Sequence, residues 1–161
     1  MNNKTFIILN VSAVFLYWLQ YFAGWSWPWL EMRQEGTGFK QGTGFAIFIF
    51  IFFQNALFVA RSKLSWKNHH KIIYQLHFRS SILSIPLLYL HSMKMGYQYT
   101  FLFSLAYSLN VLIASFAPKP FNLQNKHYKF YWMVSHVTLS TFISFFIFYL
   151  QDIVGSLFCW E

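Results

Sequence analysis

Three histidines on two hydrophobic segments are the residues of this chain best suited to chemistry. His77 and His91 lie in the apolar run from Ile72 to Met93 with 13 residues between them, and His136 lies in a second run. Fourteen steps of about 100° return almost to the starting direction, so a helix would place both rings on one face. A rise of about 1.5 Å per residue separates them by roughly 21 Å, in opposite halves of a bilayer. Imidazoles at that depth are costly and usually functional.

His77 and His136 are predicted to lie at the same depth. His77 follows Lys71 by six residues and His136 follows Lys129 by seven, which is roughly 9–11 Å from the basic boundary of each segment. A six-coordinate haem needs one imidazole above and one below the iron, and helix-borne ligand pairs commonly build such sites inside bundles. We therefore expect His77 and His136 to ligate a haem iron. The competing interpretation is that both rings hydrogen-bond to backbone or serine oxygens in the core.

Small hydroxyl residues follow both histidines at helical spacing. Those on the same helix faces are Ser80, Ser81, Ser84, Ser140 and Ser144. They would leave room for a flat macrocycle, and they would equally permit close packing of helices. Ser81 and Ser140 are therefore candidate cofactor contacts. Arg79, two residues beyond His77, is a candidate partner for a haem propionate or an interfacial anchor.

His91 has no obvious partner. A counterpart on the fifth segment would stand about fourteen residues after His136, where the sequence has Leu150 between Tyr149 and Gln151. His91 could bind a second, outer haem with an unusual or absent second ligand, contact a quinone, or lie at the membrane interface. These three interpretations stay open at this point.

Other metal chemistry is weakly indicated. Zinc normally takes three or four protein ligands, and no Cys, Asp or Glu is expected at the depth of the histidine pair. The remaining histidines belong to basic loops, where solvation is the expected state: they are His69, His70 and His127. The single cysteine, Cys159, excludes an intrachain disulfide and a Cys-rich cluster.

The composition predicts an all-α, polytopic membrane bundle. Hydrophobic residues make up 57%, aromatic residues 24% and charged residues only 10% of the 161 residues. We expect five transmembrane helices, at about 5–23, 45–60, 72–93, 97–117 and 130–150. They use nearly the whole sequence, so we expect a single integral-membrane domain without a soluble catalytic domain. The first helix is expected to be a retained signal anchor, because Tyr21–Gly24 makes a poor cleavage site.

The positive charge orients the bundle and gives no reason to expect nucleic acid. The net charge of +8 is concentrated in two loops that flank apolar runs. Their basic residues are Arg61, Lys63, Lys67 and Lys71, then Lys119, Lys126 and Lys129. The positive-inside rule places both loops in the cytoplasm, which puts the N-terminus inside and the C-terminus outside.

Three further patterns carry structural expectations. Trp25, Trp27 and Trp29 around Pro28 are typical of an interfacial aromatic belt. The duplicated Gly-Thr-Gly-Phe at 36–39 and 42–45 lacks a phosphate-loop lysine and predicts a flexible loop with close helix packing. Gln54 and Asn55 are expected to hydrogen-bond to neighbouring helices.

The histidine spacing resembles the transmembrane domain of ferric reductases and NADPH oxidases, including the small bacterial haem-binding subunits. Their third helix carries two histidines with 13 residues between them, as His77 and His91 are spaced here. His136, with the residues 130–135 that precede it, is similar to the first histidine of their fifth helix. The stretch from Thr43 to Ile47 at the start of the second helix, and the basic Arg61 and Lys63 at its end, resemble the small bacterial members. The resemblance covers about 42–150.

The resemblance implies b-type haems that carry electrons from a cytoplasmic donor toward an outer acceptor. It implies an inner haem on His77 and His136, while Leu150 departs from the pattern and leaves the outer haem open. The flavin and nicotinamide domain of many relatives is missing from these residues, so a redox partner or larger complex would supply electrons. The alternative is a cofactor-free accessory or assembly subunit of a larger membrane complex. A transporter is disfavoured because the spans hold no embedded carboxylates and five spans form no even repeat.

Overall fold

The computed structural model describes residues 3–62, 68–94, 99–118, 121, 123 and 125–158. Four residues named above lie outside these ranges, namely Lys63, Lys67, Lys119 and Cys159, as does the expected start of a helix at 97. The side chains of Arg61, Leu150 and Gln151 also lie outside the described part of the structure.

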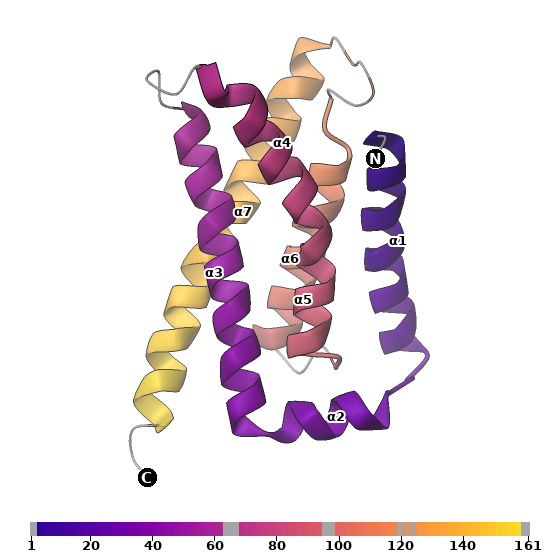
Figure 1. Ribbon diagram of the computed structural model, residues 1–161, viewed down its shortest axis with the longest axis vertical. Helices are drawn as coiled ribbons and strands as arrows, with labels where there is room; N and C mark the ends of the chain where they lie inside the picture. The colour runs from indigo at the N-terminus through magenta and orange to yellow at the C-terminus, as the bar shows by residue number, and fades with distance from the viewer. Residues whose placement is uncertain are drawn as a thin grey trace.

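All regular secondary structure in the described residues is helical (Figure 1). The elements are α1 (Asn3–Phe22), α2 (Pro28–Glu35), α3 (Thr37–Ser62), α4 (His70–Ser80), the 3₁₀ turn η2 (Ser81–Leu83), α5 (Ser84–His91), α6 (Tyr99–Ser115) and α7 (Lys126–Phe158). Within these residues three helical stretches are long and apolar enough to cross a membrane: Lys4–Phe22, Thr37–Ala60 and Lys126–Ile147. The predicted all-α fold is therefore confirmed, with three of its helices as candidate membrane spans.

The helix expected at 72–93 is interrupted in the structure. It begins at His70, passes through η2 and ends at His91. Pro86 gives the physical reason, because its ring removes the N–H that would bond to the carbonyl of Ile82 and crowds that carbonyl. The backbone tightens into a 3₁₀ turn just before the proline.

The expected glycine-rich loop is helical, and the prediction of a flexible loop was wrong. α3 begins at Thr37 and includes Gly38, Gly42 and Gly44. The Thr43 hydroxyl donates to the carbonyl of Phe39 one turn earlier, at 2.7 Å, so its polar group is satisfied within the helix. The short helix α2, with Pro28 at its start, occupies the tryptophan-rich segment before it.

The last helix begins four residues before the expected start at 130. Asn125 caps it, since its side-chain oxygen accepts hydrogen bonds from the backbone N–H groups of His127 at 2.9 Å and Tyr128 at 3.3 Å. α7 then packs against α6, and α6 packs against α1. The shared core draws on α1, α3, α5, α6 and α7, with Tyr17, Ile47, Leu88, Tyr107 and Ile143 among its buried members.

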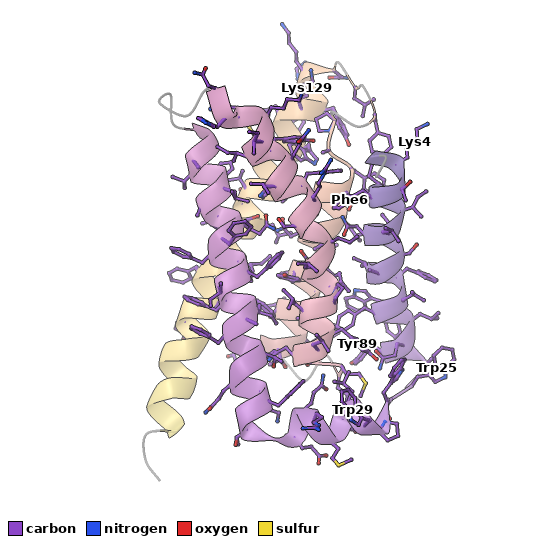
Figure 2. The ribbon with its side chains drawn as sticks, in the orientation of Figure 1. Lys4, Phe6, Trp25, Trp29, Tyr89 and Lys129 are labelled. Carbon is purple, nitrogen blue, oxygen red and sulfur yellow. The ribbon has the colours of Figure 1, made fainter. Side chains whose placement is uncertain are left out.

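The two ends of the bundle differ in chemistry (Figure 2). Lys4 and Lys129 lie at one end, together with the start of α7 and the N-terminus. Trp25 and Trp29 lie at the opposite end, where α2 crosses beneath the bundle. The expected aromatic belt is thus gathered at the end farthest from these lysines, with Trp25, Trp27 and Trp29 each more than 60% exposed.

Candidate functional site

The structure brings His77 and His136 together. His77 lies on α4 and His136 on α7, and their ring centroids are 6.2 Å apart with an angle of 72° between the planes. Residues 59 positions apart in the sequence thereby form one imidazole pair. Both side chains are partly buried.

Two cavities adjoin the imidazole pair, and both are lined by His77 and His136. The first has a volume of about 110 Å³ and lies among α3, α6 and α7, where Gln54, Asn55 and Tyr107 contribute to its wall. The second, of about 360 Å³, extends toward α1 and α4. Phe58, Ser81, Ala114 and Val137 also line both. The larger volume falls in the range of about 300–1,000 Å³ typical of ligand pockets.

His136 is held by its neighbours on α6 and α7. Its Nδ1 lies 2.8 Å from Oδ1 of Asn110, and the Asn110 amide nitrogen donates to the hydroxyl of Ser140 at 3.0 Å. The indole of Trp132 stacks on the imidazole, with centroids 5.6 Å apart and planes 18° from parallel. The Trp132 Nε1–H in turn donates to the carbonyl of Ile113 at 2.7 Å, which fixes the indole.

Asn110 and Trp132 were not anticipated from the sequence. Asn110 is the single amide side chain in α6, and Trp132 stands one turn before His136. A lone amide in an apolar helix is a signal that could have directed attention to Asn110.

Further polar contacts join the helices around the pair. The amide of Gln54 donates to the Ser80 hydroxyl at 2.8 Å, and that of Asn55 donates to Ser144 at 2.7 Å. The predicted interhelical role of both amides is thereby confirmed. Ser81 lines both cavities, donates to the carbonyl of Phe78 at 2.9 Å and accepts a hydrogen bond from Asn10 on α1 at 3.3 Å.

His91 lies in a different environment at the far end of α5. Its Nδ1 is 3.0 Å from the hydroxyl of Thr43 on α3. A Cβ atom added to Gly44 would stand 3.1 Å from Cε1 of the ring, so the imidazole packs directly on the backbone of α3. His91 thus lies in a close contact between α5 and α3, and the position of Gly44 leaves little room for a larger side chain.

The remaining candidate residues fall outside the imidazole pair. Arg79 is exposed on α4 and lines neither of the two cavities. His69 and His127 are exposed, whereas His70 is half-buried. Across the described residues, no group of three or more His, Cys, Asp and Glu side chains is arranged to hold a metal ion.

Comparison of the chain with protein-family models, with curated proteins and with solved structures found no match. The class of protein that the fold defines is an all-helical membrane protein with an imidazole pair in its interior.

Proposed function

We propose that the protein is a haem b-binding membrane subunit that relays electrons, with His77 and His136 as the axial ligands. The observation that carries this proposal is the 6.2 Å separation of the two ring centroids. Metal–imidazole bonds are about 2 Å long and a ring centroid lies about 1 Å beyond its nitrogen, so two imidazoles on one ion have centroids about 6 Å apart. Two imidazoles that hold one ion would not need parallel planes, so the 72° angle is compatible with this role.

The surroundings of the pair fit a macrocycle in two respects. The cavities that adjoin the histidines are walled by apolar side chains such as Phe58, Ala114 and Val137. The two histidines are also the right donors, since bis-imidazole ligation is typical of haem iron and two ligands are too few for a zinc site. A bound haem b would supply reversible one-electron chemistry at its iron. The protein would supply the ligands, their burial and the exclusion of water.

The proposal includes five membrane crossings. The broken helix from His70 to His91 has 22 residues, which span about 33 Å, and α6 has 17 residues, which is the lower limit for a crossing. The end with Lys4 and Lys129 would face the cytoplasm by the positive-inside rule, and the end with Trp25 and Trp29 would face outward. The imidazole pair then lies nearer the cytoplasmic side, where a soluble or membrane-bound redox partner would deliver electrons.

An absorption spectrum of the protein purified in detergent tests the proposal. We expect a Soret band in the oxidised protein and a sharpened α band after dithionite reduction. His77→Ala should abolish both bands, whereas His127→Ala, which removes an exposed histidine, should leave them unchanged. A folded protein without these bands, purified in constant ratio with other membrane proteins, would instead identify a cofactor-free accessory subunit.

A further inference from the structure

We propose that Asn110 is a positioning residue that fixes His136 in the orientation and tautomer of an axial ligand. This inference rests on the haem site proposed above and adds a residue from a third helix to it. Asn110 itself lies on α6, a different helix from the two that carry the histidines.

The hydrogen bond to Asn110 determines which nitrogen of His136 is available to a metal. A neutral imidazole carries its proton on one nitrogen and a lone pair on the other. Oδ1 of Asn110 is an acceptor 2.8 Å from Nδ1, so Nδ1 carries the proton and donates it. The lone pair is therefore on Nε2, which leaves that nitrogen as the ligand atom.

Asn110 is itself held in place, so this arrangement exists before any ligand binds. Its amide nitrogen donates to the Ser140 hydroxyl at 3.0 Å, which directs its oxygen toward the imidazole. Ser140 stands one turn after His136 on α7, and Trp132 stands one turn before it and stacks on the ring. One edge and one face of the imidazole are thus constrained by α6 and α7 together.

The bond has an electronic consequence that simple packing would not have. Hydrogen bonding of the second nitrogen to an acceptor raises the basicity of a ligating imidazole. A more basic ligand stabilises ferric iron over ferrous iron, and the interior of a bundle strengthens such a bond. Asn110 should therefore lower the reduction potential of the site.

Two variants separate positioning from packing in a redox titration of the purified protein. Asn110→Leu removes the acceptor and should weaken haem retention about 10–100-fold and raise the midpoint potential of the haem that remains. Asn110→Asp keeps an acceptor oxygen, so it should retain haem and hold the wild-type potential or lower it.

The outcomes distinguish this inference from the proposed function. Wild-type protein without haem ends both. If the wild type holds haem, two results overturn the role of Asn110 and leave the haem site standing. One is an unchanged potential in Asn110→Leu, and the other is the same upward shift in Asn110→Asp as in Asn110→Leu. If Asn110→Leu holds no haem although its circular dichroism is that of a folded bundle, retention by Asn110→Asp supports the inference and loss in both overturns it.

Discussion

The two histidines His77 and His91 lie on one broken helix and have opposite surroundings. The ring of His77 faces a second imidazole and lines two cavities. The ring of His91 contacts the backbone of Gly44 and the hydroxyl of Thr43. His77 thus adjoins a space of ligand size, toward the end with Lys4 and Lys129. His91 makes a close helix contact toward the end with Trp25 and Trp29.

The end of α5 that carries His91 is further bound by α2. The Gln34 side chain donates to the carbonyls of Tyr89 and Leu90, both at 2.9 Å, and accepts from the N–H of Met93 at 3.2 Å. These groups belong to the last turn of α5 and the residues after it. Backbone groups at a helix end have no partner within the helix, and Gln34 supplies one. The surroundings of His77 are therefore cavities, whereas those of His91 are a close helix contact next to a helix end that Gln34 holds in place. A cavity of about 330 Å³ at this end is lined by Trp25 and Met93 and not by His91.

Filling the space beside the imidazole pair should have the largest effect on haem binding. Ala114 lines both cavities, so Ala114→Phe would put a phenyl ring into them. Overpacking of about 1–3 kcal/mol corresponds to haem binding weaker by roughly 5- to 150-fold. The matched control is Ala56→Phe, which enlarges an exposed position on α3. Haem titration of the apoprotein would measure both, and equal affinities would argue that the cavities are not the binding site.

Removing the Gln34 side chain should weaken the contact between α2 and the end of α5 and leave the imidazole pair intact. Gln34→Ala leaves the Met93 N–H and two carbonyls without their partner, and each unsatisfied buried group costs about 1–3 kcal/mol. Thermal unfolding in detergent, followed by circular dichroism, should show a clear loss of stability. Gln41→Ala, at an exposed position on α3, should show none. A change in the haem spectrum of Gln34→Ala would contradict the separation of the two ends.

Two glycines of α3 test how closely His91 is packed. A Cβ at Gly42 meets nothing within 4 Å, so Gly42→Ala should gain up to about 1 kcal/mol from helix propensity. At Gly44 the added Cβ would stand 3.1 Å from the imidazole, which must shift and strain its bond to Thr43. Gly44→Ala should therefore gain less than Gly42→Ala or lose stability. Equal gains in the unfolding temperature would show that the ring moves aside freely.

The smallest effect should come from the ion pair between Glu31 on α2 and Lys94 after α5. The hydrogen bond from Lys94 lowers the pKa of Glu31 below its ordinary value of 4.5. The pair therefore contributes fully above about pH 4.5, and the contribution is lost as the pH falls through the lowered pKa. Because the pair is solvent-exposed, Glu31→Gln should change stability only slightly at pH 7 and remove this part of the acid dependence. Melting curves between pH 7 and pH 3 would show it.

The histidine pair was predictable because depth follows from distance along a helix. Counting from Lys71 and Lys129 placed His77 and His136 at one level, and the structure has their rings 6.2 Å apart. The N- and C-terminal limits of α1 and α6 also agree with the sequence-based limits within two residues. Long apolar runs between basic segments contain this information directly.

Other features depend on contacts that no periodicity reveals. The glycines before Phe45 predict a loop by local propensity, yet close packing against His91 makes a small residue useful in a helix there. The contact between Asn110 and His136 depends on the packing of α6 against α7, which the sequence pattern of either helix does not contain. The break at η2, by contrast, has a local cause in Pro86, because proline inside a helix interrupts its hydrogen bonds. The expectation of one continuous helix at 72–93 did not include this effect.

The haem-to-protein ratio of three proteins tests the contrast between the two histidine environments most directly. Pyridine haemochrome and protein assays would be applied to the wild type, His136→Ala and His91→Ala, purified in parallel. We predict one haem per chain in the wild type, none in His136→Ala and one in His91→Ala. A His136→Ala protein that keeps its haem, or a His91→Ala protein that loses it, would contradict the assignment of the site to His77 and His136.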